Sequence, residues 1–233
     1  MKLMIVPARG GSKRVPDKNI RLVGKDPLVV RTLRVSLEAG LPTLFSTDKQ
    51  SYIDIVRDYL GSKIDYELRP FEMARDNTRV VEEVFRICTS QGIKDGDTIG
   101  LMLPTSPFRS LKSLKMAIDK HKKTNKGIFS ASKYGFPLSF AFTNDFNSSG
   151  DHIWKPIFGD ESPMINGNTR SQNQNTAYHP TGGIYIFKFG DFKPNMNLYN
   201  NSLPIILDDL ECIDIDSEFD FELACALAKK GKY

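Results

Sequence analysis

Four basic side chains surround a pair of glycines near the start of the chain. Gly10 and Gly11 form the pair, and the basic residues lie on either side of it: Arg9, Lys13, Arg14 and Lys18. Glycines let backbone N–H groups converge on an anion, and the four cations exceed what a structural turn needs. The pattern favours a triphosphate site, while a tight turn with surface lysines is the structural alternative. Neither the Walker motif nor the G-x-G-x-x-G dinucleotide motif is present.

Two aspartates near the other end of the chain form a second candidate group. Asp214 and Asp216 are separated by one residue, so on an extended segment their side chains point the same way. Two carboxylates can hold one Mg²⁺ together with substrate phosphates. An exposed strand edge, or the N-cap of the following helix, stays open as the alternative, because Asp208, Asp209 and Glu211 are also near.

Two polar loops could contact other parts of a ligand. In residues 104–109, two prolines bracket two hydroxyl side chains, and such a rigid loop can contact a nucleobase or ribose, or cap the next helix. Arg170 stands two residues before Gln172, and its guanidinium can pair with a carboxylate or phosphate. For Arg170, a surface arginine on a polar loop is the alternative.

The first 130 residues alternate between apolar strands and amphipathic helices. This alternation predicts a parallel sheet with right-handed crossovers and helices on both faces. We expect strands at residues 3–6, 43–47, 64–68, 98–103 and 127–132, and helices at residues 28–39, 51–60, 78–91 and 110–123. Ligands of such sheets bind beyond the carboxyl ends of the strands. The chemistry is therefore expected in residues 7–19, 47–48, 69–76 and 104–109.

The middle of the chain has a different character. Residues 134–177 show no clean period, yet their aromatic residues make them too apolar for a disordered linker. We expect an extended segment that packs on something else, with a second subunit as one candidate. A core strand at residues 183–187 and a helix at residues 219–229 follow. The predicted organisation is thus a core of residues 1–133, an insertion of residues 134–180, and a return to the core in residues 181–233.

Composition narrows the class of protein further. The chain has 233 residues, 40% hydrophobic and 26% charged, with a net charge of +4. No apolar run of about 18 residues is present, so we expect no membrane-spanning helix. We also expect the protein to be cytoplasmic. The basic residues 120–123 lack interleaved aromatics, which favours a solvated helix end over a nucleic-acid site. The cysteines lie in apolar segments and are expected to be buried free thiols: Cys88, Cys212 and Cys225.

Several of these segments together resemble the CMP-sialic acid synthetase family, the cytidylyltransferases of nine-carbon keto sugar acids. They occur in the family's order over most of the chain: residues 8–19, 46–48, 68–70, 104–109 and 213–216. The resemblance implies a Rossmann-like nucleotidyltransferase fold and a transferase that moves CMP from CTP to the anomeric hydroxyl of a nonulosonic acid, with release of pyrophosphate. The sugar would be of the sialic, pseudaminic or legionaminic type, for surface polysaccharide.

The resemblance also assigns roles to residues. It implies four catalytic residues: Arg9, Lys18, Asp214 and Asp216. The two aspartates would bind Mg²⁺, which is the expected cofactor. It implies a nucleotide-binding set: Ala8, Arg9, Gly10, Gly11, Ser12, Lys13, Lys18, Asn19, Arg69 and Pro104. It implies a sugar-binding set, in which a cation pairs with the sugar carboxylate: Arg170, Gln172, Tyr178 and Thr181. Family members pair through the irregular middle segment, so a homodimer is expected.

Three positions depart from the family pattern. Leu103 stands where these enzymes often carry Gln, Val80 where a serine is usual, and Ser139 where a lysine is frequent. Since all three affect ligand contacts, they leave open which sugar is used and, less strongly, which base. A related nucleotidyltransferase with another base or sugar, or a catalytically idle binding or assembly member, stays open as an alternative.

Overall fold

The computed structural model of the protein divides into a core unit and an insertion unit. The structure describes residues 1–74 and 78–231. The core unit comprises residues 1–131 and 180–233, and the insertion unit comprises residues 132–179. The sequence analysis predicts these boundaries at residues 133 and 180.

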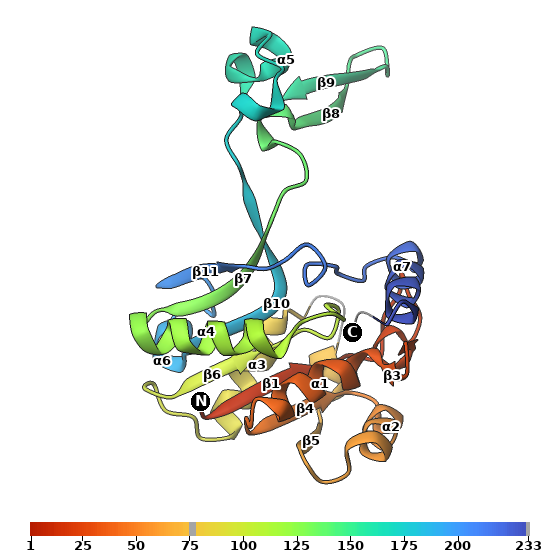
Figure 1. The fold of residues 1–233 in the computed structure, drawn as a ribbon, viewed down its shortest axis with the longest axis vertical. Helices are drawn as coiled ribbons and strands as arrows, with labels where there is room; N and C mark the ends of the chain where they lie inside the picture. Colours follow the sequence, from red (N-terminus) through yellow and green to blue (C-terminus); the bar gives the residue numbers. More distant parts are fainter. Residues whose placement is uncertain (75–77, 232–233) are drawn as a thin grey trace. The chain divides into compact units, whose positions relative to one another are not determined.

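The core unit is built on one seven-stranded sheet (Figure 1) with the order β11-β7-β10-β6-β1-β4-β5. Its strands are β1 (Leu3–Pro7), β4 (Thr43–Thr47), β5 (Asp65–Leu68), β6 (Thr98–Leu101), β7 (Gly127–Lys133), β10 (Tyr178–Lys188) and β11 (Ser202–Ile206). β1 pairs in parallel with β4 and β6, β5 continues this direction beside β4, and β11 lies parallel to β7. β10 runs antiparallel to its neighbour β6. The expected mostly parallel α/β sheet is confirmed.

Helices cover both faces of this sheet because its strands are apolar on both sides. In β1, Met4 and Val6 belong to one buried cluster, and Leu3 and Ile5 belong to another. The first cluster is completed by α1 (Leu28–Glu38), α2 (Gln50–Leu60) and α4 (Leu111–Thr124). The second is completed by α3 (Val80–Ser90) and α6 (Phe189–Phe192). The four helices expected in the first 130 residues are confirmed to within two residues at each end.

A third apolar cluster fixes the two segments that carry the candidate chemistry. Val15 from the N-terminal loop, Ile215 from the aspartate segment and Phe221 are buried in it together. The surrounding elements are η1 (Lys18–Ile20), the two-stranded sheet β2 (Leu22–Val23) and β3 (Asp26–Pro27), and α7 (Glu218–Lys229). The tail helix expected at residues 219–229 is thus confirmed. In the aspartate segment apolar and polar residues alternate, so burial of Ile215 directs Asp214 and Asp216 outward, while burial of Val15 anchors the N-terminal loop at one point.

The insertion unit contains a hairpin and several short helical turns. Its elements are η3 (Leu138–Phe140), β8 (Phe142–Phe146), β9 (His152–Pro156), η4 (Gly159–Glu161), α5 (Pro163–Asn166) and η5 (Ser171–Asn173). Every residue of β8 is exposed, so the strand lacks the apolar alternation that would have predicted it. Large apolar side chains stand open to solvent on the hairpin, among them Phe142, Phe146 and Trp154. All residues of this unit are described, and none belongs to the buried apolar clusters.

The sequence-based expectations fail at two smaller points. Cys88 is buried, but Cys212 and Cys225 are only half-buried, because the first lies in a turn and the second on a helix covered from one side. His121 is not part of a solvated helix end: it is buried, with its Nδ1 2.6 Å from the Lys126 carbonyl oxygen.

No helix within the described residues has both the length and the apolar character to cross a membrane. The core unit also contains η2 (Phe71–Ala74), which precedes the undescribed positions.

Candidate active site

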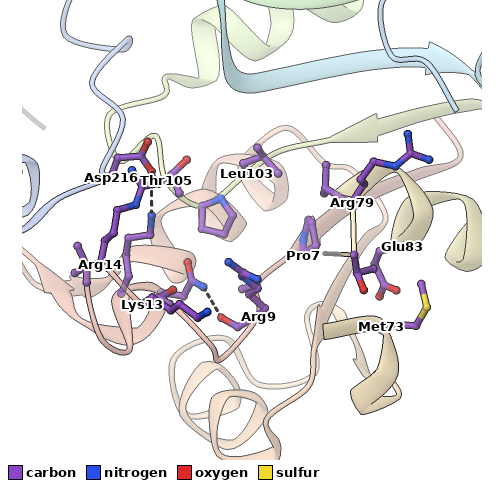
Figure 2. A pocket seen from close by; sticks show the side chains of 18 of the residues that line it. Pro7, Arg9, Lys13, Arg14, Met73, Arg79, Glu83, Leu103, Thr105 and Asp216 are labelled. Atoms are coloured by element: carbon purple, nitrogen blue, oxygen red, sulfur yellow. Dashed lines mark hydrogen bonds and ion pairs between the residues drawn. The ribbon is translucent and has the colours of Figure 1, made fainter. Parts of the chain in front are cut away.

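A pocket of about 340 Å³ lies in the core unit where β1, β5 and β6 end (Figure 2). This is the edge at which a parallel sheet is expected to bind its ligand. Nine of the residues assigned from the sequence line it: Ala8, Arg9, Ser12, Lys13, Lys18, Asn19, Arg69, Pro104 and Asp216. Gly10, Gly11 and Asp214 belong to the same segments but are not among its lining side chains. Of the expected loop residues 69–76, Arg75 and Asp76 lie outside the described residues.

The pocket has two sides of different chemistry. Figure 2 shows Arg14, Lys13, Thr105 and Asp216 on one side and Arg79, Glu83 and Met73 on the other, with Arg9 and Pro7 between. Met73 falls within the expected loop residues 69–76 but was given no role of its own from the sequence. Arg79 and Glu83 were not assigned either, because they lie at the start of α3, beyond the segments that follow the strand ends. In the sequence, the amphipathic pattern of α3 indicates its apolar, sheet-facing residues and not the polar residues near its N-terminus.

The N-terminal loop is held by side chains as well as by the backbone. Asn19, which is buried, donates from Nδ2 to the carbonyl oxygen of Arg9 at 2.9 Å. The backbone N–H of Gly10 donates to Asp48 Oδ1 at 2.8 Å. This N–H is therefore used inside the protein, although the glycine pair was interpreted from sequence as a source of donors for an anion. The basic side chains of the loop therefore lie at the pocket, while the backbone groups of Arg9 and Gly10 are hydrogen-bonded to Asn19 and Asp48.

Lys18 links the N-terminal loop to the aspartate segment. Its ammonium donates to the carbonyl oxygen of Ile215 and lies 3.8 Å from Asp216 Oδ1. The same carboxylate oxygen accepts from Arg14 Nη2 at 3.0 Å. Burial lowers the pKa of Lys18, and the negative charges of Asp216 and Asp214 oppose that shift. Lys18 thus carries its charge at the pocket in a fixed position.

Asp214 lies in an electrostatic setting that a cation would relieve. Desolvation raises its pKa first, although part of its surface is open to solvent, and the nearby Asp216 and Asp220 raise it further. The Thr105 side chain hydrogen-bonds to Asp214 and lowers the pKa, and the Thr105 carbonyl accepts from Ile215 N–H at 2.9 Å. Crowded carboxylates of this kind suit Mg²⁺. The described residues contain no group of three potential metal-binding side chains, so substrate oxygens would have to complete the coordination.

Arg69 supplies a buried positive charge at the other side of the pocket. Its guanidinium lies between two carboxylates, 3.8 Å from Asp48 and 3.7 Å from Glu83. Glu83 also accepts from Ser46 Oγ at 2.7 Å and from Arg86 Nε at 2.9 Å. Desolvation lowers the pKa of Arg69, and Glu83 and Asp48 oppose this effect. The network holds Arg69 in one orientation, because its neighbours are themselves paired.

The residues assigned to the sugar fall in both units. Arg170, Gln172 and Tyr178 are exposed in the insertion unit. Thr181 belongs to the core unit and is buried, with its Oγ1 2.7 Å from Ser130 Oγ and 3.2 Å from the Gly183 nitrogen. These internal bonds hold the Thr181 hydroxyl within the sheet, and its contact with the sugar stays a prediction. Among the departures, Leu103 and Val80 line the pocket, while Ser139 donates to Gln174 inside the insertion unit.

The sheet, its basic glycine loop and the aspartate segment beside that loop define the nucleotidyltransferase class of α/β enzymes. The chain belongs to the cytidylyltransferase family, because residues 3–211 match the sequence profile described as Cytidylyltransferase.

Curated relatives extend over nearly the whole chain. It is 30% identical to the CMP-N,N'-diacetyllegionaminic acid synthase of Legionella pneumophila over 95% of this chain and 93% of that protein. It is also 30% identical to a pseudaminic acid cytidylyltransferase of Campylobacter jejuni over 97% of this chain and 96% of that protein. The N-acylneuraminate cytidylyltransferase of Escherichia coli is 27% identical over 98% of this chain, which spans 52% of that longer protein.

Solved structures show the same fold. A CMP:2-keto-3-deoxy-manno-octonic acid synthetase complexed with CTP has a TM-score of 0.66 at 14% identity, covering 99% of this chain and 100% of that one. A 4-diphosphocytidyl-2C-methyl-D-erythritol synthase from Anaerococcus prevotii has a TM-score of 0.62 at 13% identity, covering 97% of each chain. At these identities the likeness concerns the fold alone.

Proposed function

We propose that this enzyme transfers CMP from CTP to the anomeric hydroxyl of a nonulosonic acid and releases pyrophosphate. The observation that carries the proposal is the convergence of Arg9, Lys18 and Asp216 on one pocket at the carboxyl edge of the sheet. The named relatives act on sugars of this class, and three different sugars occur among them. The proposal therefore specifies the sugar class and leaves its member to experiment.

The pocket's cations suit the charge changes of this reaction. The anomeric oxygen forms a bond to the α-phosphorus of CTP, and the bond from that phosphorus to the pyrophosphate oxygen breaks. Lys18, fixed by Ile215 and Asp216, would offset charge on the α-phosphate and the leaving group. Arg9 and Lys13 would bind the remaining phosphates. Mg²⁺ held by Asp214 and Asp216 would add charge neutralisation when bound.

The insertion unit provides candidate contacts for the sugar. Arg170 and Gln172 are exposed there, and a guanidinium can pair with the carboxylate that all these keto sugar acids carry. A related nucleotidyltransferase with another base or sugar is a second candidate. It is supported by Leu103 and Val80, which give the pocket apolar side chains where polar ones are usual in the family.

A homodimer formed through the insertion unit completes the proposal. Phe142, Phe146 and Trp154 are each more than half exposed, and such grouped aromatic side chains characterise protein interfaces. We further propose that the reaction takes place in the cytoplasm, because it consumes a nucleoside triphosphate.

One assay tests the reaction and its alternatives. Pyrophosphate release is measured with CTP, Mg²⁺ and a panel of sialic, pseudaminic and legionaminic acids, with ATP, GTP and UTP as controls. We expect release with CTP and one class of sugar, and its loss when EDTA removes the metal. Release only with another base would replace the proposed reaction by the second candidate. No release with any pair would leave an idle member of the family.

Asp216→Asn tests the metal-binding role separately. This exposed carboxylate makes little contribution to folding, so the variant should keep the wild-type melting temperature. Its Mg²⁺-dependent turnover should fall on the order of 100-fold. Unchanged turnover would exclude Asp216 from the metal site.

A further inference from the structure

The connection between β4 and α2 contacts the N-terminal loop from outside the pocket. Asp48, directly after β4, is mostly buried and accepts the Gly10 N–H at 2.8 Å. The same oxygen, Oδ1, lies 3.8 Å from the Arg69 guanidinium. One carboxylate thus contacts both the first part of the loop and the cation on the pocket's other side.

Lys49 of the same connection and Tyr52 in the first turn of α2 hold the far end of the loop. The hydroxyl of Tyr52 donates to Asp17 Oδ1 at 2.7 Å, and Lys49 Nζ lies 2.9 Å from that oxygen. Asp17 has φ of 50°, a left-handed conformation that is uncommon outside glycine, and it immediately precedes Lys18. The contacts therefore hold Asp17 in a backbone conformation that determines the direction in which the chain enters Lys18.

Gly10 allows these contacts to coexist. A Cβ atom placed on Gly10 would come within 2.6 Å of the Cγ, Cδ and Cε atoms of Lys49. With glycine at this position, the Lys49 chain can pass the loop and reach Asp17. Gly10 is therefore explained here by the passage of Lys49 and by its own N–H bond to Asp48.

The loop needs such support because its cations repel one another. Arg9, Lys13, Arg14 and Lys18 share a short segment, and like charges in proximity favour an opened loop until an anion binds. Asp48 and Asp17 supply negative charge on the side away from the pocket. Burial raises the pKa of Tyr52, so its hydroxyl keeps its proton and remains a donor to Asp17.

We propose that Asp48, Lys49 and Tyr52 form a clamp that holds both ends of the nucleotide loop and so positions Arg9 and Lys18 before nucleotide arrives. These three are positioning residues, since none of them lines the pocket. Tyr52 contributes most, because its ring is buried and its hydroxyl donates to a charged acceptor. The Lys49 ion pair is about half exposed and contributes less. The catalytic consequence of the clamp rests on the proposed function, but the clamp itself does not.

Hydrogen exchange of the free, full-length protein tests the clamp without any substrate. Tyr52→Phe keeps the buried ring and removes only the hydroxyl, so the variant should fold. We expect amide exchange in residues 8–19 to become about tenfold faster than in the wild type, and Lys49→Ala to have a smaller effect. The matched control is Tyr66→Phe, which removes the hydroxyl bond to the Gly61 carbonyl elsewhere in the core unit. Equal exchange in Tyr52→Phe and the wild type would overturn the proposal.

Asp48 gives a second test with a built-in rescue. Asp48→Ala should speed exchange of the Gly10 amide, and Asp48→Asn, which retains an acceptor oxygen, should restore part of the protection. Equal exchange in these two variants would contradict the bond to Gly10. In steady-state kinetics, Tyr52→Phe should raise KM for CTP about tenfold and leave KM for the sugar unchanged. If the wild type released no pyrophosphate, the proposed function would fail while the exchange data still decided the clamp.

Discussion

The two units use the same kinds of side chain in opposite ways. In the core unit, β1 and β4 are buried along their whole length, and Phe45 has no exposed surface. In the insertion unit, β8 is exposed along its whole length, and Phe146 is 59% exposed. The core unit therefore uses its apolar surface to stabilise itself, whereas the insertion unit leaves that surface available to a partner.

The polar residues of the two units differ in the same way, since those of the core unit are held by contacts and those of the insertion unit are exposed. Lys18, Asp48 and Arg69 are held by neighbours inside the core unit. Arg170 and Gln172 are exposed in the insertion unit. The fold of the core unit thus holds the charged side chains of the pocket in place, while the proposed sugar contacts are less constrained within their own unit.

A pair of phenylalanine substitutions tests this difference most strongly. Phe45→Ala in the core unit should lower the free energy of unfolding by about 3–5 kcal/mol, because it removes a fully buried ring. Phe146→Ala in the insertion unit should change it by less than about 0.5 kcal/mol in the monomer. Chemical denaturation at low protein concentration measures both. Similar losses for the two variants would show that Phe146 stabilises its unit as Phe45 does, against the contrast in their burial.

Charge removal in each unit should affect different kinetic constants. Lys18→Ala should lower kcat by about 100- to 1,000-fold, because it removes a fixed charge beside the reacting phosphate. Arg170→Ala should instead raise KM for the sugar by about tenfold or more, from the loss of a charged hydrogen bond. Steady-state assays with each substrate varied separately make the distinction. A fall in kcat for Arg170→Ala with an unchanged sugar KM would argue against its assignment to the sugar.

The exposed aromatic residues of the insertion unit predict a weaker dimer when one is made charged. Trp154→Asp should raise the dissociation constant of the dimer by about 30-fold or more, as expected for a central aromatic contact. Sedimentation equilibrium over a range of concentrations measures this change. The matched control is Tyr59→Asp, an exposed aromatic residue of α2 in the core unit, which should leave the association unchanged. A wild-type protein that stays monomeric at all concentrations would remove the proposed dimer.

Thiol reactivity measures how accessible the interior of the core unit is to a small reagent, and here we expect the smallest effect. Burial raises the pKa of the Cys88 thiol to about 12, so its reactive thiolate is scarce at pH 8 and increases only as the pH rises towards that value. Iodoacetamide at pH 8 should modify the half-buried Cys212 and Cys225 while Cys88 stays unmodified. Peptide mass spectrometry identifies the sites, and all three should react in guanidinium chloride. Rapid native modification of Cys88 would show that the core opens more readily than its packing indicates.

The core unit could be predicted well from the sequence because its segments carry strong local patterns. β1 was recognisable as a continuous apolar run, as expected of a strand buried on both faces, and the helices that follow were recognisable by their helical spacing of apolar residues. The pocket's place followed from the parallel sheet, and Arg9, Lys18 and Asp216 do meet there. Whether they perform the chemistry assigned to them remains a prediction.

What the sequence did not predict depends on contacts between distant residues. The bond from Gly10 to Asp48 joins positions 38 residues apart, and no local pattern indicates it. Glu83 appeared as one polar residue of an amphipathic helix, although it is buried against Arg69 and Ser46. The hairpin of the insertion unit escaped prediction for another reason: without a buried face, its strands carry no alternation.

The position of the insertion in the sheet has a consequence for how such enzymes can diversify. The chain leaves the core unit from β7 and re-enters through β10, and these strands are neighbours in the sheet. The exit and the return are therefore separated by about 5 Å, the ordinary distance between paired strands. A segment joined at two adjacent points can be lengthened, shortened or exchanged by recombination without cutting another strand connection. Exchange of this one continuous segment would change the proposed sugar contacts Arg170, Gln172 and Tyr178 together, and it would leave the residues that line the pocket in the core unit unchanged.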